Sequence, residues 1–341
     1  MYRIGIIGCG KIAQIRHIPE YIASGKAELA AFYDLNAARA EELAARYHGK
    51  AYHSVDELLD SGVDAVSVCT SNATHAEITI KALEKGIPVL CEKPMAVSLA
   101  EAEAMTEAAA RSGKVLMIGQ NQRLNGTHRM ARDIIRRGDI GKVLSFRTIF
   151  GHGGPETWSI DPGKNTWFFD KSRACMGAMA DLGIHKTDLI DFLLDDEVVS
   201  VSASVTTLDK KDAEGNLIGV DDNAICIYTM KSGAVGTMTA SWTYYGEEDN
   251  STTIYGTDGI MVIYGPSGHS ISITLKDGSH IYYDIDRMQT NDAQTSSGVI
   301  DEFLLSLDRG WAEISAASVL PAMKAVFGAI ESSRTRREVR I

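Results

Sequence analysis

The first third of the chain alternates between short apolar runs and longer amphipathic segments. Helical patterns begin at capping boxes such as Ser54 to Glu57 and Ser98 to Glu101. The apolar runs have the length and the β-branched character of buried parallel strands; they cover residues 2–7, 29–33, 65–69, 89–91 and 115–118, the last being counted as the sixth strand. The pattern is counted as six strands, five of them with the ranges just given, and with its crossover helices it predicts an α/β domain whose parallel sheet is doubly wound, as in the Rossmann fold.

The pattern changes in the rest of the chain. Helical patterns cover 127–137 and 179–194, and two more, at 297–307 and 317–332, close the chain. A strand pattern covers 143–150, and further runs with a period of two or apolar character lie at 199–207, 224–230, 234–243, 252–255, 260–264, 271–275 and 280–285. Turn signals with glycine separate these runs, which therefore predict an antiparallel sheet. We expect one domain over residues 1–122 and a second over 123–341, whose last helix can pack back on the first.

A glycine-rich turn follows the first strand. Gly8, Gly10 and Ala13 form the pattern GxGxxA, and Lys11 and Ile12 open the next helix. The glycines permit a tight turn and let backbone N–H groups approach a pyrophosphate at the helix N-terminus. A lone match is weak evidence, but the strand before it and the helix after it are the context that a dinucleotide site requires.

The second strand ends in an acidic residue, Asp34. A carboxylate there can accept hydrogen bonds from the adenosine ribose hydroxyls and repels a 2′-phosphate, which favours NAD over NADP. Arg39, one helical turn further, is able to soften that preference. The alternative is that Asp34 only caps the next helix.

Polar residues follow the other strand ends, where parallel sheets bind ligands. We expect them to face one crevice and to bind the cofactor; they are Thr70, Ser71, Asn72, His75, Glu92, Lys93, Gln120 and Asn121. Pro94 stiffens the backbone and biases Lys93 to an extended conformation. The ammonium group of a lysine at this place can also polarise a substrate oxygen. Taken alone, a lysine in a loop is better explained as a surface residue.

The stretch from Met176 to Asp188 brings acidic and imidazole groups together. Asp181 and His185 are four residues apart, Asp188 follows three later, and on a helix all three share one face. A carboxylate beside an imidazole suits a general acid/base. The alternatives are a solvated polar face and a metal site.

Together, GCGKIA at the start, TSNATH at 70–75, EKP at 92–94 and DLGIHKTD at 181–188 resemble the glucose–fructose oxidoreductase / inositol dehydrogenase (Gfo/Idh/MocA) family over nearly the whole chain. The resemblance implies an N-terminal NAD(P)-binding Rossmann domain and a C-terminal α+β domain with a large, mostly antiparallel open sheet. It also implies homodimers or homotetramers that pack through that sheet. The Gly-Gly pair common in the family before the aspartate is matched here only by Gly177.

The resemblance implies a catalytic set of Lys93, Asp181 and His185. Hydride would pass from a carbinol C–H of a polyol, inositol, aldose or related sugar to the nicotinamide, with His185 taking the hydroxyl proton. A cationic lysine in that site argues against a metal, so none is expected. Two alternatives stay open: a redox-neutral, NAD-dependent enzyme that cleaves glycosides, and a relative that senses ligands without catalysis.

Candidate substrate residues come from polar and aromatic positions outside these motifs. Arg123 ends the polar run after the sixth strand, His152 and Trp167 lie in or beside a long glycine-rich connection, and Tyr244 follows a strand. Aromatic faces commonly stack on sugars, although ordinary packing explains each residue equally well.

Composition limits the partners. The net charge of −11 argues against a general nucleic-acid surface. No apolar run approaches the length of about 18 residues that a membrane span needs, so no membrane association is expected. Five scattered cysteines without a CxxC pair fit a reducing, cytoplasmic location.

Overall fold

In a computed structural model of the chain, residues 1–287 and 296–341 are described, and they group into two compact units. The first contains residues 1–121 and 296–320, and the second contains 122–287 and 321–341. The return of 296–320 to the first unit differs from the contiguous division at 122/123 that the sequence suggests. Glu20 helps to hold residues 296–320 in the first unit. Its carboxylate accepts hydrogen bonds from the backbone nitrogens of Ser297, at 2.6 Å, and Ile300, at 3.3 Å.

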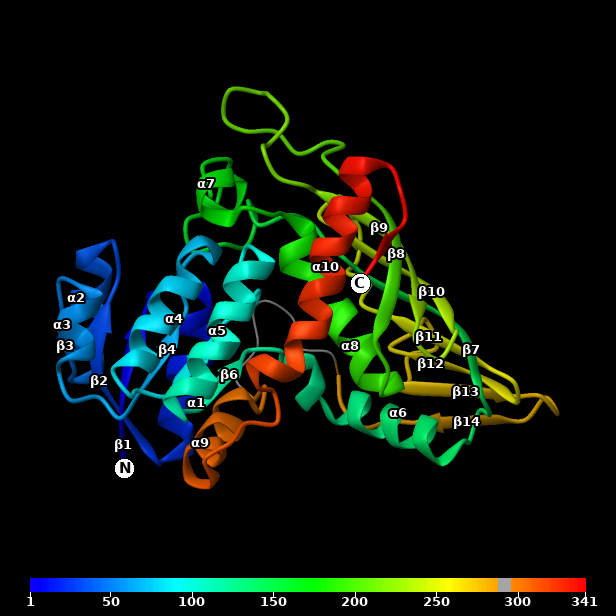
Figure 1. Ribbon diagram of the computed structural model, residues 1–341, viewed down its shortest axis with the longest axis horizontal. Coiled ribbons are helices and arrows are strands. Elements are labelled where there is room, and N and C mark those ends of the chain that lie inside the picture. The colour runs from blue at the N-terminus through cyan, green and yellow to red at the C-terminus, as the bar shows by residue number, and fades with distance from the viewer. Residues whose placement is uncertain (288–295) are drawn as a thin grey trace. The chain divides into compact units, whose positions relative to one another are not determined.

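The first unit is built on a parallel six-stranded sheet in the order β3-β2-β1-β4-β5-β6 (Figure 1). Its strands are β1 (Tyr2–Ile7), β2 (Ala27–Tyr33), β3 (Lys50–Ala51), β4 (Ala65–Val68), β5 (Val89–Cys91) and β6 (Leu116–Ile118). This order confirms the predicted doubly wound sheet. The strand order reverses between β1 and β4, where ligands bind such sheets.

Two helices of the first unit begin at the predicted capping boxes of Ser54 and Ser98, and Asn36 caps a third. Asn36, Ser54 and Ser98 each accept a hydrogen bond from a backbone N–H in the following turn, which stabilises the helix start. The helices are α1 (Ile18–Ser24), α2 (Ala37–Tyr47), α3 (Val55–Leu59), α4 (His75–Glu84), α5 (Leu99–Ser112) and α9 (Val299–Arg309), and α10 (Ala316–Thr335) starts in this unit.

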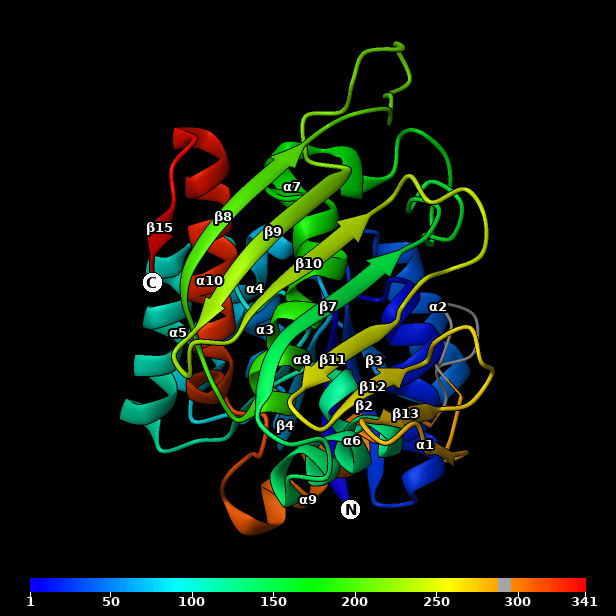
Figure 2. The same ribbon diagram turned by 90° about the vertical axis from the view of Figure 1, so that its right-hand side faces the viewer.

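The second unit contains a nine-stranded sheet in the order β14-β13-β12-β11-β7-β10-β9-β8-β15 (Figure 2). All neighbouring strands are antiparallel except β7 and β10. The strands are β7 (Val143–Gly151), β8 (Val198–Thr206), β9 (Asn223–Met230), β10 (Val235–Ser241), β11 (Thr252–Gly256), β12 (Gly259–Ile263), β13 (Ile271–Leu275), β14 (His280–Tyr283) and β15 (Val339–Arg340). The predicted mostly antiparallel sheet is confirmed.

One face of this sheet packs against helices α6 (Gly126–Arg137) and α8 (Ile184–Leu194), while α7 (Lys171–Ala174) lies in the connection after β7. In β9, Tyr228 is fully buried, and its hydroxyl lies 2.9 Å from that of Thr187 on α8. The alternate positions Ile225 and Ile227 are 55% and 51% exposed on the outer face. No helix among the described residues has the length and apolarity to cross a bilayer.

Candidate active site

The turn after β1 contains two glycines, Gly8 and Gly10, whose surroundings differ. Gly8 has φ +92°, and a Cβ on it would lie 2.6 Å from the carbonyl group of Cys69, so only glycine fits. A Cβ on Gly10 would meet nothing within 4 Å, which leaves the approach to its backbone open. Lys11 and Ile12 then begin the helix, which continues as a π-helical turn over Ala13–His17.

Asp34 braces this turn. Its carboxylate accepts hydrogen bonds from the backbone nitrogens of Cys9 and Asn36, each at 2.7 Å. Asn36, rather than Asp34, provides the side-chain cap of α2. The capping alternative for Asp34 is therefore wrong, and its predicted contact with a ribose stays a prediction.

Two strand-end loops of the first unit meet at His75. Its Nδ1 lies 2.8 Å from the carbonyl oxygen of Pro94 and its Nε2 lies 3.1 Å from that of Thr70. Burial lowers the pKa of His75, and the neutral ring carries one N–H, so it donates to one carbonyl at a time. Asn72 is also buried, while Thr70 and Ser71 are partly exposed in the same loop.

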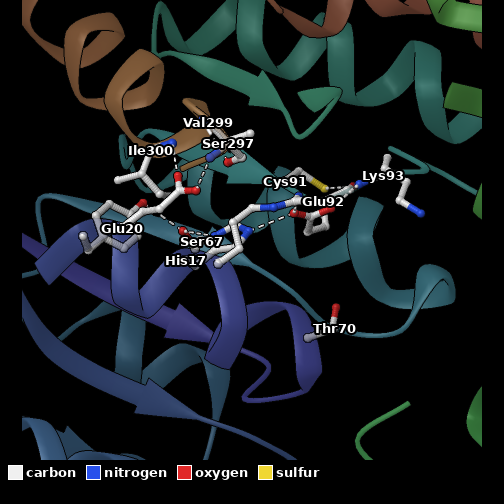
Figure 3. A network of polar contacts seen from close by, with 12 residues as sticks. His17, Glu20, Ser67, Thr70, Cys91, Glu92, Lys93, Ser297, Val299 and Ile300 are labelled. Atoms are coloured by element: carbon white, nitrogen blue, oxygen red, sulfur yellow. Dashed lines mark hydrogen bonds and ion pairs between the residues drawn. The ribbon is translucent and has the colours of Figure 1, made fainter. Parts of the chain in front are cut away.

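A buried ion cluster precedes Lys93 (Figure 3). Glu92 Oε1 lies 3.1 Å from Arg16 Nη1 and 2.8 Å from His17 Nε2, and Glu92 Oε2 accepts from the backbone nitrogen of Lys93 at 3.2 Å. Burial alone would raise the pKa of Glu92, but Arg16 and His17 outweigh it and hold that pKa well below its usual range. Ser67 contacts the other ring nitrogen of His17 at 3.1 Å.

The side chains of Glu92 and Lys93 therefore lie in different surroundings. The carboxylate of Glu92 is engaged inside the unit, so its predicted contact with the cofactor stays a prediction. The side chain of Lys93 is partly exposed and extends away from the cluster (Figure 3).

The loop after β6 carries buried polar atoms without a partner among the described residues. Both amide atoms of Gln120, which is 1% exposed, and Oδ1 of Asn121 lack a hydrogen bond there. A Cβ on Gly119 would lie 3.1 Å from the carboxyl group of Glu92, which is a tight contact. Glycine at this position therefore lets the loop lie close to Glu92. Unsatisfied buried amides are costly, and they are the groups that a polar ligand would satisfy.

In the second unit, the predicted helix over 179–194 begins as a π-helical turn at Met179–Gly183 and continues as α8. Asp221 is bonded to this start, because its carboxylate accepts from the backbone nitrogens of Gly177 and Met179, each at 2.7 Å. Its carbonyl oxygen accepts from the nitrogen of Ala178 at 2.8 Å. A regular helical pattern did not reveal the π turn, which depends on these tertiary bonds.

This helix presents its polar residues to different partners. Asp181 and His185 are 9% and 7% exposed, and Asp181 Oδ2 accepts a hydrogen bond of 3.0 Å from the indole Nε1 of Trp242. Asp188 instead forms a two-pronged ion pair with Arg123, at 2.7 and 2.5 Å. Asp188 is thereby structural, and the guanidinium of Arg123 is engaged with it; a substrate contact for Arg123 stays a prediction.

The sequence pattern did not reveal two further ionisable side chains on α8 whose charged atoms are buried. Lys186 is fully buried, its Nζ donates to the carbonyl oxygen of Asn250 at 2.9 Å, and burial lowers its pKa to about 7. The carboxylate oxygens of Asp191 have no hydrogen bond among the described residues, and burial, with the nearby charge of Asp188, raises its pKa. The sequence feature that could have indicated these two residues is a charged residue at a helix position that is otherwise apolar.

Two of the predicted substrate residues, His152 and Trp167, belong to one aromatic cluster in the second unit. The ring of His152 lies 6.1 Å from that of Trp158, which lies 5.1 Å from Phe168, and Trp167 stacks on Phe168 at 3.9 Å. Tyr244 is partly exposed, and its ring packs against Gly151. A Cβ on Gly151 would lie 2.2 Å from the Tyr244 ring. These contacts explain the residues by packing, and contacts with a substrate stay predictions.

Comparison with known proteins agrees with this architecture. Residues 2–120 match the oxidoreductase family with an NAD-binding Rossmann fold, and residues 128–262 match the GFO/IDH/MocA C-terminal domain. A myo-inositol 2-dehydrogenase of Thermotoga maritima is 30% identical over 83% of this chain and 78% of that protein. A glucose-6-phosphate 3-dehydrogenase of Bacillus subtilis is 34% identical over 66% of this chain, and the match spans 63% of that protein.

Among solved structures, levoglucosan dehydrogenase in complex with NADH and levoglucosan superposes with a TM-score of 0.87 at 23% identity, covering 100% of this chain and 99% of that one. The glycine turn, the strand order and the two matched domains define an oxidoreductase with NAD as its cofactor. The chain belongs to the Gfo/Idh/MocA family, as the sequence motifs indicate.

Proposed function

We propose that this oxidoreductase transfers a hydride between NAD and a CH–OH carbon of a sugar, inositol or related polyol. The observation that carries the proposal is that the chain contains both Lys93, partly exposed just after β5, and the buried Asp181 and His185 on a helix whose start is bonded to Asp221. Relatives named glucose-6-phosphate 3-dehydrogenase, myo-inositol 2-dehydrogenase and levoglucosan dehydrogenase support this substrate class.

The proposed roles follow from the chemistry of each side chain. His185 accepts the proton of the hydroxyl, Asp181 orients the imidazole and stabilises its charged form, and the Lys93 ammonium stabilises the oxygen as it loses its proton. NAD, when bound, supplies the hydride acceptor. The open backbone at Gly10 and the unsatisfied amide of Gln120 fit the binding of a phosphate and a carboxamide.

The test is NADH formation, followed by absorbance, with inositols, glucose, glucose 6-phosphate, levoglucosan and sugar acids, run beside NADP and a Lys93→Ala control. Signal with one group of compounds, lost in the control, would support the proposal and identify the substrate class. Silence across the panel with NAD bound would contradict it. Cleavage of glycosides without net NADH would then identify a redox-neutral enzyme, and ligand binding without turnover a sensor.

We also propose that copies of the chain associate through the outer face of the nine-stranded sheet. Ile225, Ile227 and Val235 are 55%, 51% and 43% exposed on neighbouring strands of that face. Burial of such an apolar patch favours association. Ile225→Lys should reduce the mass measured by light scattering, whereas Ile22→Lys, at a similarly exposed position on α1, should not. An unchanged mass in both variants would exclude this face.

A further inference from the structure

Trp242 is the largest fully buried side chain of the second unit. It follows β10, and its indole N–H donates to Asp181 Oδ2 at 3.0 Å. A hydrogen bond between a neutral donor and a carboxylate is worth more than one between neutral groups. In a buried setting this bond both favours the charged form of Asp181 and assigns one of its two oxygens to the indole.

The position of the indole is fixed on several sides. Its ring contacts Phe168 and Phe169, with centroids 6.4 and 6.2 Å away. Its backbone nitrogen donates to the carbonyl oxygen of Asp222 at 2.8 Å. The Asp222 carboxylate in turn accepts from the backbone nitrogens of a neighbouring turn, at 2.8 Å each; these belong to Leu208, Asp209 and Lys210.

The acceptor side depends on the adjacent residue. Asp221 accepts the backbone N–H groups of Gly177 and Met179 at the start of the helix that carries Asp181. Donor and acceptor of the indole bond are therefore both tied to the consecutive residues Asp221 and Asp222. One short segment of the chain therefore contacts both the element that carries the indole and the start of the helix that carries the carboxylate.

We propose that Trp242 is a positioning residue for the acid/base pair, acting by donating its indole N–H to Asp181 and thereby setting the orientation and basicity of that carboxylate beside His185. The inference rests on the proposed function, since it assumes that Asp181 and His185 act on substrate. Its specific consequence is that loss of the N–H makes the Asp181 carboxylate easier to protonate, because the carboxylate loses a donor that stabilises its charged form.

The test is the pH dependence of kcat/KM in Trp242→Phe. We expect kcat/KM at neutral pH to fall about 10-fold and the acidic limb to move up by about one pH unit, the size of one charge-assisted hydrogen bond. In an Asp181→Asn background the same substitution should cause little further change, because the two act through one bond. Trp311→Phe, at a 60% exposed position of the first unit, is the matched control and should change neither quantity.

An unshifted acidic limb in Trp242→Phe, with Asp181→Asn strongly impaired, would overturn the inference alone. Fully additive losses in the double variant would also overturn it, because they indicate a purely structural role. Normal turnover of Asp181→Asn would overturn the proposed function instead. If Trp242→Phe fails to fold, β-(3-benzothienyl)alanine at position 242 keeps the indole shape without the N–H, and the same shift is expected there.

Discussion

The carbonyl oxygen of Asp221 lies where a side chain on Gly177 would have to be: a Cβ built on that glycine would approach it to 1.8 Å. The same aspartate binds the backbone nitrogen of Gly177 through its carboxylate, at 2.7 Å. The start of the helix that bears Asp181 and His185 is therefore held by contact as well as by hydrogen bonds. Gly177 is the position that matches the family's glycine pair, and this contact gives the physical reason for glycine there.

Gly177→Ala should displace this helix start. Because backbone rather than a flexible side chain opposes the new methyl group, we expect a loss of stability of about 1–3 kcal/mol and a larger proportional loss of kcat than of NAD affinity. Thermal unfolding, kcat and the Kd for NAD measure the three effects. Gly246→Ala, where a Cβ meets nothing within 4 Å, is the control. Equal behaviour of the two variants would contradict the proposed constraint.

Lys93→Ala and His185→Ala should each slow the chemical step by about 10²–10⁴-fold, as expected for positioned acid/base groups. The Kd for NAD should stay nearly unchanged in His185→Ala. Single-turnover kinetics measure the step, and Lys85→Ala, which removes a surface ion pair with Asp60, is the control. Near-normal turnover in both variants would remove the catalytic assignment.

Glu92→Gln should destabilise the first unit at neutral pH by about 3–5 kcal/mol, because Arg16 loses its buried counter-charge. The pKa of Glu92 is depressed in the folded chain, so its stabilisation is present above the unfolded value of about 4.3 and is lost as pH falls through the folded value. Urea unfolding across the acidic range should therefore show a smaller pH dependence in the variant.

Glu28→Gln is the matched control for Glu92→Gln, because it breaks the exposed ion pair with Arg3, whose side chains are 50% and 48% accessible. Such pairs contribute about 0–1 kcal/mol. A loss of stability in Glu92→Gln no greater than in this control would show that the buried cluster is not needed for folding.

Lys186→Met should change how stability varies with pH. Burial lowers the pKa of Lys186 to about 7, whereas an unfolded lysine titrates near about 10.4. Between these values the unfolded chain binds a proton that the folded chain does not, so this residue makes stability rise with pH, by at most about 5 kcal/mol. The variant should lack that rise relative to the wild type in urea unfolding, and exposed Lys231→Met should retain it. Parallel curves for Lys186→Met and the wild type would contradict the assignment.

Asp34→Asn should alter cofactor preference. The variant loses the charge that repels a 2′-phosphate and one of the two acceptors that hold Cys9 and Asn36. We expect the ratio of kcat/KM for NADP to that for NAD to rise about 10-fold, an energy of about 1.4 kcal/mol. A uniform loss with both cofactors would mean that Asp34 acts only as a brace of the glycine turn.

The sequence by itself determined the two-domain α/β architecture, the parallel and antiparallel sheets, the family and the cofactor. These follow from local information: the spacing of apolar residues, the capping side chains and motifs whose members are close in sequence, such as Gly8 to Ala13 and Asp181 to His185. The sequence predicts no residue range for β3 or β15, because a run of two residues has no measurable period.

Only the tertiary structure decided which polar residues are engaged with the protein itself. Glu92 joins Arg16 and His17, Asp188 joins Arg123, and Trp242 joins Asp181, each across a long stretch of sequence. Nothing in the local pattern distinguishes a carboxylate held by a buried cation from one left for a ligand. That distinction depends on distance and burial, which are set when segments remote in sequence pack together.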